Sequence, residues 1–202
     1  KHSSSFNSQI KIFDKKALVI DMENQLRCFS LETGEIIWSV KTQTSILRSQ
    51  KKQSLILNKG RVYFSNSIGD VTAVDIQSGK IIWQTPTQSN ITFASTYFLK
   101  LSDIVSDEKS IFVSDNNNQF FSIDLLSGAI NWKQDLSSEL RSALIGDYLV
   151  TISDDGLLIV MNKESGQIIR INDLLKNIKE KKRKYFKPVG FLVGKFHIYL
   201  ST

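Results

Sequence analysis

Short runs of alternating apolar and polar residues cover most of the chain. Between positions 61 and 85, three pairs of apolar residues can each share one face of a strand: Val62/Phe64, Val71/Ala73 and Ile81/Trp83. Alternation over five or six residues between turn-forming residues predicts β-strands, because successive side chains of a strand point to opposite faces. No long stretch has helical periodicity. The pattern predicts an all-β protein.

A fifteen-residue pattern occurs four times along the sequence. The four segments are Asn24–Trp38, Gly69–Trp83, Asn118–Trp132 and Gly156–Arg170. Each contains one turn glycine, and these are Gly34, Gly79, Gly128 and Gly166. The glycines are separated by 45, 49 and 38 residues, which is the length of one four-stranded propeller blade.

At two positions of this repeat, the residue types have a physical reason. Each segment begins with Asn or Gly, which accept the left-handed backbone of a tight hairpin. Four residues before each turn glycine stands a short polar side chain that can bond the backbone of a turn: Ser30, Asp75, Asp124 and Asn162. Each repeat is preceded by a further predicted strand: Lys16–Asp21, Arg61–Asn66, Ser110–Asp115 and Tyr148–Ser153.

These features predict meandering four-stranded blades of a β-propeller. Stacked blades cover the faces that one sheet leaves bare, and the bulky tryptophan suits the space between neighbouring sheets. An all-β sandwich is the alternative, and the common register of the four segments favours the propeller. We predict one partial propeller domain over residues 1–202, with blades at about 8–40, 53–86, 102–135 and 141–172 and the start of the next blade at 187–202.

Both ends of the sequence look cut, since Lys1 is not an initiator Met and the last residues form a strand-like run. An incomplete ring would expose two blade faces and an unpaired strand edge. We therefore expect either a piece of a longer protein or two chains that pair to complete the ring. Cys28 is the sole cysteine, so no internal disulfide can form.

The pattern Asp-x-x-Ser/Thr-Gly-x-x-x-Trp, preceded by a Gly or Asn hairpin, resembles the PQQ-like repeat. That repeat occurs in quinoprotein dehydrogenases, in BamB-type outer-membrane assembly factors and in extracytoplasmic sensor domains. The resemblance covers nearly the whole chain and implies four PQQ-like blades with the start of a fifth, in an incomplete ring.

Two loops resemble the BamB type more closely. The segment Ser45–Arg48 is similar to the inter-blade loop with an LxLR motif that this family uses against its partner BamA, although serine replaces the first leucine. The segment Leu101–Ile104 is similar to the second, Asp-containing loop that faces BamA. The resemblance implies that Leu47, Arg48 and Asp103 contact the partner.

The function implied by this resemblance is that of a non-catalytic periplasmic scaffold at the outer membrane. It would bind a BamA-type insertase, with unfolded outer-membrane proteins as further partners, and it would need no cofactor. A lipid anchor belongs to this expectation, although none is visible in the chain. The alternatives are a fragment of a PQQ-dependent quinoprotein dehydrogenase and an extracytoplasmic sensor domain.

Composition changes this picture at one place only. The chain is 41% hydrophobic and 23% charged, as is ordinary for a globular protein, and its net charge is +6. Between Lys176 and Lys187 lie seven basic residues and one acidic residue, so this segment accounts for the whole net charge. A solvated loop is the simplest interpretation, and a contact with anionic lipid or an acidic partner is the sharper one. Few aromatic residues interleave, which argues against nucleic acid.

No catalytic or metal site is expected from the residues. His2 lies in a Ser-rich stretch and His197 alternates with apolar residues in a predicted strand, so neither joins a Ser/His/Asp group. The oxygen-rich segments Asp115–Asn118 and Asp154–Gly156 coincide with the hairpin column of the repeat. Neither has the twelve-residue spacing of a calcium loop, so a turn role explains both.

Overall fold

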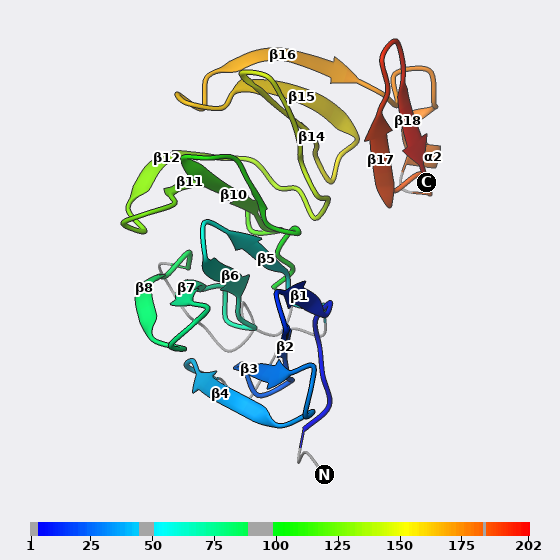
Figure 1. The fold of residues 1–202 in the computed structure, drawn as a ribbon. Coiled ribbons are helices and arrows are strands. Elements are labelled where there is room, and N and C mark those ends of the chain that lie inside the picture. Colours follow the sequence, from blue (N-terminus) through cyan, green and yellow to red (C-terminus); the bar gives the residue numbers. More distant parts are fainter. Residues whose placement is uncertain (1–3, 45–50, 89–98, 184) are drawn as a thin grey trace. The chain divides into compact units, whose positions relative to one another are not determined.

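The regular secondary structure of the described residues is almost entirely antiparallel β-sheet (Figure 1). The computed structural model describes residues 4–44, 51–88, 99–183 and 185–202. Within these residues it has four four-stranded sheets, one two-stranded sheet and the short helix α2 (Glu180–Arg183). No helix in the described part of the chain has the length and apolar character needed to cross a membrane. The all-β prediction is confirmed.

Every four-stranded sheet is a meander in which each strand pairs with the next along the chain. The first contains β1 (Lys11–Phe13), β2 (Lys16–Ile20), β3 (Gln25–Ser30) and β4 (Ile36–Lys41). The second contains β5 (Leu55–Asn58), β6 (Arg61–Ser65), β7 (Val71–Asp75) and β8 (Ile81–Thr85). The third contains β9 (Val105–Ser106), β10 (Ser110–Ser114), β11 (Phe120–Asp124) and β12 (Ile130–Gln134). The fourth contains β13 (Ala143–Ile145), β14 (Tyr148–Ile152), β15 (Leu157–Asn162) and β16 (Ile168–Asp173), and β17 (Gly190–Val193) pairs with β18 (Ile198–Ser201).

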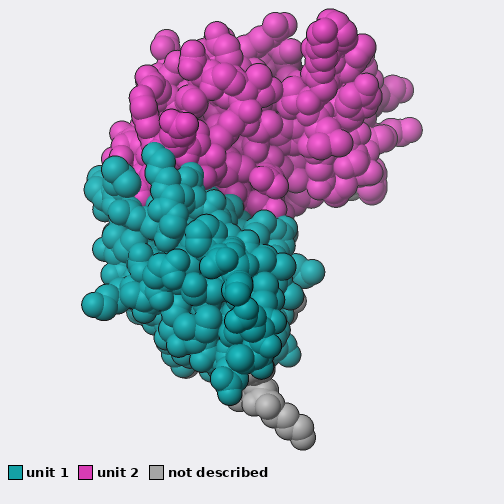
Figure 2. Space-filling view, in the orientation of Figure 1, with its two compact units in different colours: residues 1–100, 126–129 teal, residues 101–125, 130–202 magenta. Residues whose placement is uncertain are grey.

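The chain forms two compact units, which Figure 2 colours separately. Unit 1 comprises residues 1–100 and 126–129 and holds the first two sheets. Unit 2 comprises residues 101–125 and 130–202 and holds the strands of the remaining sheets.

The hairpins have the backbone that the repeat predicted. The residue that opens each repeat has a positive φ, and the values at Asn24, Gly69, Asn118 and Gly156 are 58°, 102°, 61° and 81°. In the turn between β7 and β8, Asp75 Oδ1 accepts hydrogen bonds from the backbone N and the Oγ of Ser78, both at 2.7 Å. These bonds stabilise the carboxylate and hold the pKa of Asp75 below its ordinary value.

In unit 1, the tryptophan column joins the two sheets. Trp38 packs against an apolar cluster that contains residues of both, among them Leu18 and Val62. Its Nε1 donates a hydrogen bond to the carbonyl oxygen of Ile76 at 3.0 Å. Its ring lies so close to Gly79 that a Cβ there would stand 2.7 Å from a ring carbon. The repeat glycine is therefore required both by the turn and by the ring above it.

Unit 2 repeats this arrangement with other residues. Trp132 packs on a cluster that contains Phe112 and Met161, and its Nε1 donates to the carbonyl oxygen of Lys163 at 3.0 Å. Its ring also stacks on Phe120, with centroids 5.9 Å apart. In the fourth sheet the equivalent residue is Arg170, which is exposed. Apolar residues of the following segment cover that sheet's other face: Leu174, Phe191, Val193 and Leu200.

One irregularity recurs in every four-stranded sheet. The pairing of the third and fourth strands shifts by one residue at the same place, between Cys28 and Phe29 in the first sheet and between Ala73 and Val74 in the second. The third and fourth sheets shift at Ser122/Ile123 and at Val160/Met161. A bulge increases strand twist, so its recurrence gives each sheet the same twisted outer strand.

Candidate partner-binding site

Of the three residues predicted to contact a partner, the structure describes Asp103. Leu47 and Arg48 lie outside the described residues. Asp103 is half-buried and lies in the connection between β8 and β9. Its neighbours Ser102 and Ile104 are both buried, so the carboxylate is the polar group that this stretch leaves partly accessible.

The connection that carries Asp103 is fastened to β10. Ser102 N donates to the carbonyl oxygen of Ser114 at 2.7 Å, and Ser114 N donates to Ser102 Oγ at 2.9 Å. Leu101 forms an antiparallel bridge with Asp115 just beyond the strand. Asp103 therefore follows two residues whose backbone is fixed, which limits the conformational entropy that a contact would cost.

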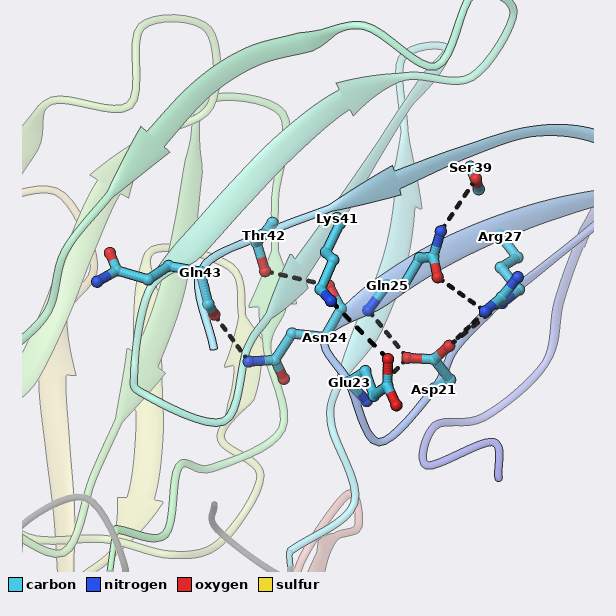
Figure 3. Close-up of polar contacts among 9 residues, drawn as sticks. All are labelled: Asp21, Glu23, Asn24, Gln25, Arg27, Ser39, Lys41, Thr42 and Gln43. Carbon is cyan, nitrogen blue, oxygen red and sulfur yellow. Dashed lines mark hydrogen bonds and ion pairs between the residues drawn. The ribbon is translucent and has the colours of Figure 1, made fainter. Parts of the chain in front are cut away.

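The chain on either side of residues 45–50 is also fastened. Asn24 Nδ2 donates to the carbonyl oxygen of Gln43 at 2.9 Å, and Thr42 N donates to the carbonyl oxygen of Asn24 at 3.1 Å (Figure 3). On the other side, Gln53 N donates to the carbonyl oxygen of Asn7 at 2.8 Å. The sequence assigned Asn24 to a hairpin alone, but this buried amide also holds the backbone at Gln43, just before the predicted partner loop.

A buried ion pair lies beside the same hairpin (Figure 3). Asp21 Oδ2 accepts hydrogen bonds from Arg27 Nε at 3.2 Å and Nη2 at 2.9 Å. The Asp21 side chain is 0% exposed and that of Arg27 is 12% exposed. Asp21 Oδ1 meanwhile accepts the backbone N–H groups of Glu23 at 2.8 Å and Gln25 at 3.1 Å. One carboxylate thus closes the turn and neutralises the arginine.

The repeat position that Asp21 occupies was not identified from the sequence. Its equivalents stand three residues before the left-handed residue of each hairpin, and they are Asn66, Asp115 and Ser153. All are buried, and each accepts a backbone N–H of its own hairpin through a side-chain oxygen. The oxygen-rich segment at Asp115 is thereby explained by the turn. Among the described residues, no three histidine, cysteine or carboxylate side chains gather as metal ligands would.

The comparisons with known proteins decide the family. A family model described as outer membrane protein assembly factor BamB matches residues 2–172. The chain belongs to the BamB family. An uncharacterised protein of Rickettsia prowazekii is 25% identical over 188 residues, which is 91% of this chain and 45% of that protein. The BamB of Alkalilimnicola ehrlichii is 23% identical over 162 residues, which is 75% of this chain and 39% of that protein.

Solved structures show the same fold. BamB from Moraxella catarrhalis superposes with a TM-score of 0.64 at 17% identity, over 85% of this chain and 54% of that one. A europium-containing methanol dehydrogenase reaches a TM-score of 0.64 at 13% identity, over 82% of this chain and 41% of that one. The predicted β-propeller blades and PQQ-like repeat are confirmed. This BamB-family chain spans less than half of the two related sequences, and its fold is found in an assembly factor and in an enzyme.

A second feature of this BamB-family chain is a charged cavity in unit 2. Its volume is about 380 Å³. The two cationic side chains that line it are both paired with carboxylates. Arg183 Nη1 lies 3.0 Å from Asp173 Oδ2, and Lys187 Nζ lies 3.2 Å from Glu139 Oε1. The residues that line it are Asp154, Asp155, Leu175, Glu180, Arg183, Phe186 and Lys187.

One carboxyl group that lines the cavity is less readily ionised than an ordinary aspartate. Burial raises the pKa of Asp154, and the negative charges of Glu139 and Asp155 add to this. Relative to the unfolded chain, the fold therefore disfavours ionised Asp154, and stability falls as pH rises from the ordinary aspartate pKa through the raised pKa. We expect Asp154→Asn to raise the thermal midpoint near neutral pH. The gain should vanish in acid below the ordinary aspartate pKa, as thermal unfolding at several pH values would measure.

Asp107 provides the matched control with the opposite sign. Its burial would raise its pKa, but hydrogen bonds from Lys109 and Ser110 and the ion pair with Lys163 outweigh burial and lower it. Asp107→Asn should therefore lower stability near neutral pH by about 1 kcal/mol, or roughly 3 °C in the midpoint. The loss should disappear as pH falls below the lowered pKa. Equal and pH-independent effects of the two substitutions would contradict both assignments.

Proposed function

We propose that the chain is a non-catalytic scaffold of the BamB kind on the periplasmic side of the outer membrane. It binds a BamA-type insertase through inter-blade loops and so supports the insertion of β-barrel proteins, with unfolded outer-membrane proteins as further partners. The observation that carries the proposal is the match of the BamB family model over residues 2–172. A lipid anchor on the full-length protein would hold the scaffold at the membrane.

The binding mechanism follows from the chemistry of three side chains. Leu47 supplies an apolar anchor, and Arg48 pairs with a carboxylate of the insertase through its planar guanidinium. Asp103 offers a partly accessible carboxylate to a cation of the partner. The hydrogen bonds that Asn24 makes to Thr42 and Gln43 fix the backbone just before the first loop.

Charge reversal at Arg48 tests this contact. Arg48→Glu should abolish pull-down of the insertase, because the pair becomes a repulsion and the binding constant falls by roughly 100-fold or more. Arg141→Glu changes the net charge equally at an exposed arginine outside the predicted partner loops and should leave the pull-down intact. Both variants should keep the thermal midpoint of the parent. Undiminished pull-down by the Arg48 variant would remove this loop from the interface.

A further inference from the structure

We infer that the described part of the basic segment, residues 176–183 and 185–187, forms together with Val189 a docking surface for an anionic phospholipid bilayer. The inference goes beyond the insertase contact, because it concerns a different surface and a different kind of partner. The segment links the fourth sheet to β17 within unit 2 and contains α2.

The first observation is that four lysines of the described part of this segment have no side-chain partner among the described residues. Arg183 and Lys187 are held by Asp173 and Glu139. Four others have exposed side chains and no ion pair or hydrogen bond of those side chains to any described residue: Lys176, Lys179, Lys181 and Lys182. Glu180 is the only acidic residue among them. The fold therefore leaves a local excess of positive charge uncompensated at its surface.

The second observation is that large apolar side chains follow these lysines directly at the surface. Tyr185 is 74% exposed and Val189 is 67% exposed, and Phe186 between them is also exposed. The intervening Pro188 is buried, so the backbone here is seated on the fold while the side chains of Tyr185 and Val189 remain largely exposed. Basic residues beside exposed aromatic and aliphatic ones are typical of segments that lie in the interface of a bilayer.

The kinds of residue favour a bilayer over an acidic protein. Lysine is a compact, flexible point charge that suits a diffuse layer of phosphates, whereas specific recognition of a carboxylate prefers the planar fork of arginine. The segment's one described arginine is already paired with Asp173. The long lysine stems also allow the ammonium groups to reach headgroups while Tyr185 lies deeper.

Co-sedimentation with vesicles tests the inference. The purified chain should bind vesicles of phosphatidylcholine with phosphatidylglycerol, should bind pure phosphatidylcholine much less, and should be released by salt. Replacing Lys176, Lys179, Lys181 and Lys182 by serine should weaken binding about fivefold per lysine, and so by roughly 600-fold in total. Replacing the same four by arginine should preserve binding.

A charge-matched variant provides the control. Serine at Lys15, Lys41, Lys80 and Lys109 removes the same net charge from exposed positions elsewhere. This variant should lose only a few-fold in binding, because none of these four lysines belongs to the proposed docking surface. Equal loss in the two serine variants would overturn the inference, since the effect would then reflect net charge alone. Failure of the parent chain to bind phosphatidylglycerol vesicles would also overturn it.

A fluorescent reporter separates a bilayer from an acidic protein. Tyr185→Cys, carrying an environment-sensitive dye in a Cys28→Ser background, should shift to the blue on adding anionic vesicles, because the dye enters an apolar layer. Polyglutamate should produce no such shift. A chain that binds polyglutamate as tightly as vesicles, with no shift on vesicles, would show an acidic-protein surface instead and would overturn the bilayer assignment.

Discussion

Gly79→Ala is expected to lower the free energy of unfolding by about 3 kcal/mol or more, whereas Gly34→Ala should cost only about 1 to 2 kcal/mol. The two glycines occupy the same turn position, with φ values of 71° and 73°. Any L-residue pays the left-handed strain at both. At Gly79 a Cβ would also stand 2.7 Å from the Trp38 ring, whereas at Gly34 no atom lies within 4 Å. Chemical denaturation of the two variants would measure the difference.

The difference between the two variants isolates the contact between the sheets of unit 1. Trp38→Ala on its own should cost about 3 kcal/mol or more, because it leaves a cavity and frees the Ile76 carbonyl oxygen. The double variant Trp38→Ala/Gly79→Ala has no clash. Its loss in free energy of unfolding should therefore be clearly smaller than the sum of the two single losses. Equal losses at Gly34 and Gly79 would mean that the ring does not press on the turn.

Asp21→Ala is expected to cost about 3 to 5 kcal/mol, because it leaves Arg27 nearly buried without its counter-charge. The same substitution removes the acceptor for the backbone N–H groups of Glu23 and Gln25. Adding Arg27→Leu should recover part of this loss, since no buried charge then remains unpaired. Urea denaturation of the single and double variants would measure both steps.

The exposed ion pair of the same sheet provides the control. Lys15 Nζ lies 2.6 Å from Glu32 Oε1, but the two side chains are 70% and 63% exposed. Glu32→Ala should therefore change stability by less than about 0.5 kcal/mol despite the short distance. A loss at Glu32 as large as the loss at Asp21 would contradict the role assigned to burial.

Local chemistry made the sheets predictable. The strands β2, β6, β10 and β14 begin where the alternation placed them and end within one residue of it. Asn24 and Gly79 were identified because a left-handed backbone is a property of the residue itself. Asp75 was identified because a short polar side chain reaches only its own turn.

The features that could not be predicted from the sequence depend on contacts that form only in the folded chain. The bulge opposite Phe29 arises from pairing across strands, and no single residue type marks it. Asp21 looks like an ordinary turn residue in the sequence, because aspartate is common in turns. Only the folded sheet brings Arg27 to its carboxylate. Asp103 came from resemblance to a family, while its fixation depends on the bridge of Leu101 with Asp115.

Calorimetric titration of the purified chain with the periplasmic region of its own organism's BamA-type insertase tests the proposed function most directly. We predict a saturable one-to-one complex that weakens with added salt, because Arg48 and Asp103 each form an ion pair with the insertase. A chain that gives no complex with this insertase, and that instead carries the absorbance of a bound quinone, would contradict the scaffold and favour a quinoprotein.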